Sequence, residues 1–252
     1  MTTKEKADQF AALHVRGAPL MLYNAWDAGS AKIIVNAGAK AVATSSSAVA
    51  ESQGYADGEE IPQALAEKIV GRIVASVDVP VSLDFEGGYT EDNVELGESI
   101  KRLLDLGVVG VNFEDRVVQG EGLYDIRRQT ARIAAIRKAA SEAGIALFIN
   151  ARTDVFLGRG GSPSEAAKAA VQRGQAYADA GASGFFVPGV KDEALIERLC
   201  DAVALPVNVM ILNGVPSIGQ LAKAGVSRIS YGSIPHGTAM AALLEEAWKI
   251  YV

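Results

Sequence analysis

The sequence predicts an α/β protein, a single (β/α)8 barrel of the TIM type that covers residues 1–252. Three observations support this prediction. Eight short apolar runs alternate with amphipathic segments, two kinds of junction recur between them, and the length is usual for one such barrel. The composition, with 49% hydrophobic and 21% charged residues, excludes a disordered or fibrous protein.

The first kind of junction is a glycine that ends a helical pattern just before an apolar run. Glycine suits a helix C-terminus because it enters the left-handed conformation without a Cβ clash. These glycines are Gly38, Gly107, Gly181 and Gly225, and the apolar runs that follow them are 41–43, 109–113, 185–187 and 228–230.

The second kind of junction is a proline that opens an apolar run. Proline is tolerated at the first residue of a strand, where its missing N–H is not yet needed. It opens the runs 20–23, 81–83 and 207–209, and 146–151 completes the set of eight. The clearest helical segments are 62–77, 93–106, 127–143, 164–180 and about 236–251.

Strict alternation of strands and helices implies a parallel sheet, either open and doubly wound or closed into a barrel. Eight units favour closure. An open dinucleotide-binding sheet would more often show Gly-x-Gly-x-x-Gly after its first strand, whereas residues 23–29 read Tyr-Asn-Ala-Trp-Asp-Ala-Gly. The open sheet remains the alternative.

Charge and cysteine content narrow the partners and the compartment. The formal net charge is −6 and no basic run occurs, so nucleic-acid binding is not expected. The single cysteine cannot form an intramolecular disulfide. The N-terminal residues lack the apolar stretch of a signal peptide, and no window is apolar enough to span a membrane. We therefore expect a cytoplasmic protein without a membrane partner.

Acidic residues gather where the predicted strands end, which is where barrel enzymes carry their active sites. Asp84 and Glu86 follow the third strand, Glu114 ends the fourth, and Asp57 lies in the loop after the second. Carboxylates this close repel one another unless a cation lies among them. The all-oxygen set indicates Mg²⁺, with Mn²⁺ possible, rather than Zn²⁺. The alternative is that these acids only solvate the mouth or cap helices.

Two further groups at the strand ends are suited to an anionic substrate. The guanidinium of Arg152 can bind a carboxylate bidentately and stabilise an oxyanion, or it can simply pair with Asp154 or Glu114. The run after the second strand offers backbone N–H groups and hydroxyls to a carboxylate, or ordinary helix capping. Its residues are Ser45, Ser46 and Ser47.

At these positions the chain resembles the isocitrate lyase and phosphoenolpyruvate mutase superfamily, over essentially its whole length, in the branch of phosphonopyruvate mutase-like and oxaloacetate or 2-methylisocitrate lyase-like proteins. Each motif is short, but their order and spacing are specific. They are Asn24-Ala25-Trp26-Asp27 with Ser30-Ala31, Thr44-Ser45-Ser46, Gly54-Tyr55-Ala56-Asp57, Asp84-Phe85-Glu86-Gly87-Gly88-Tyr89, Asn112-Phe113-Glu114-Asp115 and Asn150-Ala151-Arg152-Thr153-Asp154.

The resemblance implies a barrel whose Mg²⁺ is held mainly by Asp84, while the other three acids act chiefly through water. It also implies an α-keto acid, or its alcohol precursor, that chelates the metal, with its carboxylate against the amides of residues 45–47 and with Arg152 in contact. We assign Trp26, from the first motif, to substrate binding as well. Superfamily members are typically tetramers of dimers that exchange a C-terminal helix, so we expect a homodimer or homotetramer.

The gating loop departs from the superfamily pattern. Related lyases carry Lys-x-Cys-Gly-His there, with the cysteine as acid/base catalyst, whereas residues 116–124 read Arg-Val-Val-Gln-Gly-Glu-Gly-Leu-Tyr. The mutase-type gate is missing too. The single thiol, Cys200, lies in a helical segment and is expected to pack rather than react. The candidate proton donors are therefore Glu121, Tyr124 and His236.

Asn208, in the seventh predicted strand, is a candidate donor to a substrate carboxylate, or a residue that bonds to loop backbone. His14, near the start of the chain, is expected to be structural.

Three functions follow from these residues. The first is a Mg²⁺-dependent lyase that cleaves a C–C bond of a small α-keto or 2-hydroxy di- or tricarboxylate through a metal-stabilised enolate, with oxaloacetate-like or alkylmalate-like substrates. The second is phosphonopyruvate-type P–C mutase or hydrolase chemistry. The third is a binder of α-keto acids without catalysis.

Overall fold

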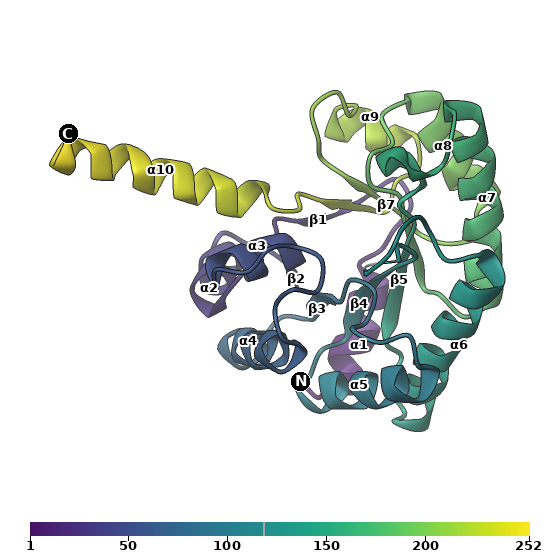
Figure 1. Ribbon diagram of the computed structural model, residues 1–252, viewed down its shortest axis with the longest axis horizontal. Helices are drawn as coiled ribbons and strands as arrows, with labels where there is room; N and C mark the ends of the chain where they lie inside the picture. Colours follow the sequence, from purple (N-terminus) through teal and green to yellow (C-terminus); the bar gives the residue numbers. More distant parts are fainter. Residues whose placement is uncertain (118) are drawn as a thin grey trace.

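The computed structural model describes residues 1–117 and 119–252 and contains an eight-stranded parallel sheet in the order β1-β8-β7-β6-β5-β4-β3-β2 (Figure 1). Each strand coincides with one of the predicted apolar runs to within about two residues at either end. The strands are β1 (Leu20–Leu22), β2 (Val42–Ala43), β3 (Val81–Asp84), β4 (Gly110–Glu114), β5 (Phe148–Arg152), β6 (Gly184–Phe186), β7 (Val207–Met210) and β8 (Arg228–Ser230).

The sheet is nearly closed between its first and last members. Beyond the end of β1, the Ala25 N–H donates to the Ala43 carbonyl at 2.8 Å, and the Ser45 N–H donates to the Ala25 carbonyl at 3.2 Å. A parallel bridge between Ala25 and Thr44 therefore joins β1 to β2. The predicted barrel is confirmed and the open-sheet alternative is wrong.

Helices surround the strands (Figure 1). The predicted segments 62–77, 93–106, 127–143 and 164–180 correspond to the four longest helices packed on the barrel, shifted by one residue at most of their ends. The helices are α1 (Thr3–Ala12), α2 (Ala28–Asn36), α3 (Ser46–Ser52), α4 (Gln63–Ser76), α5 (Asn93–Asp105), α6 (Ile126–Glu142), α7 (Pro163–Asp179), α8 (Glu193–Ala202), α9 (Ile218–Lys223) and α10 (Ile234–Tyr251), and a short irregular turn, η1 (Val155–Arg159), precedes α7.

The main core lies between the sheet and this helical layer. In α5, Leu96, Ile100 and Leu103 are spaced to lie on one face of the helix, and all three are buried. They belong to the same apolar cluster as Val111 of β4. Cys200 of α8 is also buried there, which raises the pKa of its thiol to about 11 and agrees with a packing role.

A second core fills the bottom of the barrel. Phe10, from α1, enters it and packs with Leu20, Leu22 and Phe148. Gly110 is needed for this entry, because a Cβ at that position would lie 2.6 Å from Phe10 Cε1. The ring of His14 stacks on Phe148 with 3.9 Å between centroids, so His14 is structural, as expected. We call this set of residues the floor of the barrel.

The last helix, α10, projects away from the barrel (Figure 1). Only Pro235 and His236, at its beginning, are buried, whereas Leu243 and Trp248 are 62% and 59% exposed. Within the residues that the structure describes, no helix is both long and apolar enough to cross a bilayer.

Candidate active site

The C-terminal ends of the strands form the mouth of the barrel, and the register between neighbouring strands brings the predicted residues together there. Asp84 of β3 is paired with Asn112 of β4, and Glu114 of β4 is paired with Arg152 of β5. Because the strands are parallel, these four side chains lie on three adjacent strands at one end of the barrel. The sequence-based grouping of Asp84, Glu114 and Arg152 is thus reproduced in space.

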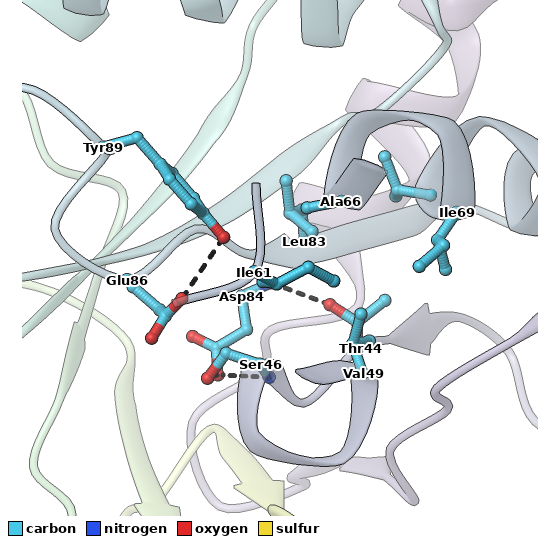
Figure 2. Close-up of a pocket in the computed structure, with 11 residues that line it drawn as sticks. Thr44, Ser46, Val49, Ile61, Ala66, Ile69, Leu83, Asp84, Glu86 and Tyr89 are labelled. Atoms are coloured by element: carbon cyan, nitrogen blue, oxygen red, sulfur yellow. Dashed lines mark hydrogen bonds between the residues drawn. The ribbon is translucent and has the colours of Figure 1, made fainter. Parts of the chain in front are cut away.

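Asp84 is held on both of its carboxylate oxygens. Oδ2 accepts hydrogen bonds from the Ser46 N–H at 3.1 Å and the Ser46 hydroxyl at 3.0 Å (Figure 2). Oδ1 accepts one from Asn112 Nδ2 at 3.3 Å. The same Ser46 hydroxyl lies 3.2 Å from Asp57 Oδ1. Two of the four predicted metal-binding carboxylates therefore share one hydroxyl.

Glu86 is turned into the mouth by an unusual loop. Its Oε1 accepts the N–H groups of Gly58 and Glu59 at 3.0 and 3.1 Å, and its Oε2 lies 3.4 Å from the Tyr89 hydroxyl (Figure 2). Glu59, Glu86 and Tyr89 all have left-handed φ angles, of 63°, 50° and 61°. In return, the Tyr89 N–H donates to Glu59 Oε1 at 2.8 Å. Non-glycine residues keep such conformations only where their surroundings impose them.

The mouth carries an excess of negative charge. Burial, and then the charges of Asp84 and Asp57, raise the pKa of Glu86 to about 8. Partial burial and the charge of Asp84 also raise the pKa of Asp57. Carboxylates that are harder to ionise because other carboxylates lie nearby are stabilised when a cation enters. This electrostatic strain is what a divalent metal would relieve.

The donor set at the mouth fits a hard cation that keeps part of its water shell. Among the described residues, no three His, Cys, Asp or Glu side chains are arranged as a complete metal site. Mg²⁺ needs only one or two direct carboxylates, because it dehydrates reluctantly. Asp84 as a direct ligand, with Asp57 and Glu86 acting through water, satisfies that requirement, and Mn²⁺ takes similar oxygen ligands.

Arg152 lies between two carboxylates. Its Nη1 is 2.9 Å from Glu114 Oε2, while its Nε and Nη2 are 2.7 and 3.1 Å from the two oxygens of Asp154. Both ion pairs that the sequence offered as alternatives are therefore present. Within the described residues, hydrogen bonds to Asp154 use two of the five N–H groups of the guanidinium, and Nη1 forms the ion pair with Glu114, so N–H groups remain for a ligand. Burial raises the pKa of Glu114, and the nearby Arg152 opposes that shift.

A fully buried carboxylate, Asp115, holds the backbone of Asp154, the residue that pairs with Arg152. Its oxygens accept from Arg173 at 2.9 Å, from the Tyr177 hydroxyl at 2.7 Å and from the Asp154 N–H at 3.1 Å. Asp115 thereby ties the start of the gating loop to the residue that holds Arg152. This network is not predictable from the sequence, since its partners are far apart along the chain and only their burial identifies them.

The serines after β2 have partners inside the protein. The Ser45 N–H donates to Ala25 and the Ser46 N–H to Asp84, so both amides are engaged. Ser47 follows them in the first turn of α3. Trp26 is half-buried beside this helix, and its ring lies 5.0 Å from that of His236. The three serines and Trp26 remain predicted substrate contacts.

The three candidate proton donors lie in different surroundings. The Tyr124 hydroxyl donates to Glu91 at 2.7 Å, and burial together with this bond raises the pKa of Tyr124 to about 12. Tyr124 lines a cavity of about 310 Å³ that also reaches Tyr89. His236 Nδ1 is 3.3 Å from Glu51 Oε2. Glu121 is exposed on the gating loop, whose Val118 is outside the described residues.

Asn208 lies within the barrel rather than at its mouth. Its Nδ2 donates to the carbonyls of Val209 and Arg228 at 3.0 and 3.2 Å, and its Oδ1 accepts from Asn150 at 3.0 Å. The backbone-bonding alternative for this residue is the one observed, with strand rather than loop carbonyls as acceptors.

Comparison with known proteins gives a consistent family. The family model described as phosphoenolpyruvate phosphomutase matches residues 10–251. An uncharacterized protein of Mycobacterium tuberculosis is 32% identical over 238 residues, which cover 94% of this chain and 87% of that protein. The 2-methylisocitrate lyase of Bacillus subtilis is 25% identical over 210 residues, covering 81% and 66% of the two chains.

Solved structures agree with this result. The crystal structure of "a putative phosphonomutase" from Burkholderia cenocepacia J2315 is 44% identical, with a TM-score of 0.93 over 96% of this chain and 99% of that one. A 2,3-dimethylmalate lyase of 23% identity superposes with a TM-score of 0.87 over 98% of this chain and 87% of that one. At that identity the second similarity establishes the fold alone.

Proposed function

The chain belongs to the phosphoenolpyruvate phosphomutase family, within a superfamily of lyases and mutases, and from this premise we propose that it is a Mg²⁺-dependent carbon–carbon lyase. Its substrate is a small α-keto or 2-hydroxy di- or tricarboxylate. The observation that carries the proposal is the pairing of Arg152 with Glu114 beside the excess of carboxylates around Asp84. The guanidinium of Arg152 is one positive group, and the carboxylates around Asp84 attract a metal ion as a second. Two neighbouring positive groups suit a substrate with two anionic groups.

Besides these groups, the reaction needs acid–base groups that move protons. In a 2-hydroxy acid, a general base takes the hydroxyl proton and the oxygen forms a carbonyl as the adjacent C–C bond breaks. The electron pair of that bond goes to the other fragment as an enolate, which a general acid protonates. A Mg²⁺ held by Asp84, with Asp57 and Glu86 through water, would supply Lewis-acid stabilisation of the negative charge that develops on the substrate. The remaining N–H groups of Arg152 would bind the substrate carboxylate, and Glu114 would keep the guanidinium in place. The proton donor is Glu121, Tyr124 or His236.

Phosphonopyruvate-type P–C chemistry is the second candidate. It is favoured by the 44% identity to the Burkholderia chain named above. Against it stands the gating loop, which lacks the mutase-type sequence at residues 116–124. Binding of an α-keto acid without catalysis is a third candidate, since the loop also lacks the lyase cysteine.

One panel of compounds separates the three candidates. The protein is incubated with Mg²⁺ and oxaloacetate, alkylmalates, methylisocitrate or phosphonopyruvate, and the products are followed by chromatography and phosphorus NMR. Metal-dependent release of pyruvate, glyoxylate or oxalate supports the lyase, whereas a new phosphorus resonance supports P–C chemistry. Thermal stabilisation by these acids without any turnover would leave only the binder.

We also propose that the protein is a homodimer or homotetramer in which α10 packs on a second copy. A projecting helix with exposed Leu243 and Trp248 is a large apolar surface for a soluble protein to leave in water. Light scattering should show an oligomer that Leu243→Lys with Trp248→Lys reduces to smaller species. The control is Ile33→Lys, which charges an apolar position on α2 that is even more exposed than Leu243 and Trp248. A wild-type monomer would contradict the proposal.

A further inference from the structure

A charged side chain, Arg228 of β8, lies in the barrel interior between the floor and the mouth. It is 1% exposed. Its Nη2 donates to Asn112 Oδ1 at 3.1 Å, and its guanidinium lies 5.9 Å from the Phe10 ring. Among the described residues, no carboxylate forms a salt bridge with it, and its Nε and Nη1 have no hydrogen-bond partner.

Packing alone does not account for this residue. An apolar side chain of similar volume is often neutral or stabilising where a charge would be buried. Burial lowers the pKa of Arg228 to about 9, which is still above neutral pH, so the charge persists. Its neighbour His14 is neutral, because burial and the charge of Arg228 lower the pKa of that histidine to about 3. The acid whose charge favours the Arg228 cation is Asp84.

The connection between Arg228 and Asp84 is the amide of Asn112. Its Oδ1 accepts from Arg228 Nη2 at 3.1 Å and from Asn150 Nδ2 at 2.8 Å. Its Nδ2 donates to Asp84 Oδ1 at 3.3 Å. A guanidinium only donates and a carboxylate only accepts, so the opposite orientation would set donor against donor and acceptor against acceptor. The buried cation, together with Asn150, therefore favours the orientation in which Asn112 Nδ2 faces Asp84.

We propose that Arg228 is a positioning residue for the metal site: it orients the Asn112 amide, which in turn holds the Asp84 carboxylate in the direction that receives the cation. Arg228 itself touches neither metal nor substrate. The proposal rests on the metal dependence of the proposed function, and it assigns a role to a residue below the mouth that is joined to Asp84 through one amide.

The test is the dissociation constant of Mn²⁺, measured by electron paramagnetic resonance on the full-length protein, together with the melting temperature. Loss of a bond that orients a charged ligand should raise the Mn²⁺ Kd of Arg228→Met about tenfold, with Tm unchanged or higher. Arg228→Lys, which retains a cationic donor, should stay within about threefold of wild type. The control is Arg137→Met, since Arg137 donates to the Gly181 and Leu147 carbonyls away from the site and should leave the Kd unchanged.

The sign of the effect separates positioning from simple electrostatics. A cation repels a divalent ion, so removing the charge alone would tighten Mn²⁺ binding. Tighter or unchanged binding by Arg228→Met would overturn the proposal. In an Asn112→Ala background, Arg228→Met should have no further effect on the Kd, because the connection is already cut. Additive effects would show that Arg228 does not act through Asn112.

A crystal structure of Arg228→Met decides the positioning even if the wild-type protein binds no Mn²⁺. That result would refute the metal dependence of the proposed function but not the orientation of Asn112. A rotated Asp84 carboxylate in the variant supports the positioning role. An Asp84 with the wild-type rotamer, still bonded to Asn112, overturns it.

Discussion

The two ends of the barrel bury polar groups in opposite ways. At the floor, Phe10 and Phe148 enclose His14, and burial keeps its imidazole neutral. At the mouth, Asp84 and Glu86 remain close to other carboxylates, and Glu86 resists ionisation until a cation relieves the repulsion. Burial at the floor therefore favours the neutral form of a titratable group, whereas the mouth holds several carboxylates close together.

Stability and function depend on opposite ends of this barrel. The floor depends on shape, since Gly110 leaves the space that Phe10 fills. The mouth retains left-handed residues such as Glu86, and like charges that cost stability. We expect changes at the floor to alter stability with little effect on activity, and changes at the mouth to do the reverse.

The largest effect is expected at the mouth, from Arg152→Lys. Lysine keeps the charge beside Glu114 but loses the planar fork, so kcat/KM for the best substrate of the panel should fall about a hundredfold. Thermal unfolding should show little change, because both carboxylates still have a cation. Arg159→Lys is the control, since Arg159 contacts Asp154 at a longer distance, 3.8 Å, and is more exposed than Arg152. An equal loss in both variants would refute a special role for Arg152.

At the floor, Gly110→Ala should reduce the free energy of unfolding by about 2 kcal/mol, because the new methyl group displaces Phe10. Activity per folded molecule should be retained. Urea denaturation measures the first quantity and steady-state kinetics the second. Gly219→Ala serves as the control, since a Cβ there meets nothing within 4 Å. A loss of activity without a loss of stability would break the comparison between the two ends.

The floor should also make the protein sensitive to acid. The pKa of His14 is about 3 in the folded protein, against an ordinary value of 6.5, so the unfolded chain takes up a proton first as pH falls. Stability from this residue is complete above pH 6.5 and declines below it, by ~2 kcal/mol at pH 5. His14→Gln should abolish that part of the decline between pH 6.5 and 5 in urea denaturation. His236→Gln, at the other histidine, is the control, and a slope unchanged by His14→Gln would contradict the interpretation.

At the mouth, pH should act on metal binding instead. Because the pKa of Glu86 is about 8, a proton must leave its carboxylate before the cation can benefit from the charge. The Mn²⁺ Kd should therefore fall by up to about tenfold per pH unit from pH 6 to 8 and level off above 8. Glu86→Gln should flatten the profile. A wild-type Kd independent of pH would show that Glu86 takes no part in the site.

Much of the fold was predictable because it depends on local signals. Glycines such as Gly107 and prolines such as Pro80 mark where helices end and strands begin, whatever surrounds them. Position at a strand end was enough to group Asp84 with Arg152, since parallel strands deliver their ends to one side. The partners of these residues were harder to foresee. Tyr89 and Glu59 become part of the site only through a loop that holds Glu86 in a left-handed conformation.

Residue type and order along the chain were enough to predict the eight-unit barrel, the acids at its mouth and the absence of the usual gating-loop cysteine. The position of Arg152 between Glu114 and Asp154, and the connection from Arg228 to Asp84 through Asn112, exist only in the folded chain. Hydrogen bonds of this kind join residues up to 116 positions apart, and burial makes their direction matter. The spacing of residues along a chain does not predict which buried donor will bond to which acceptor.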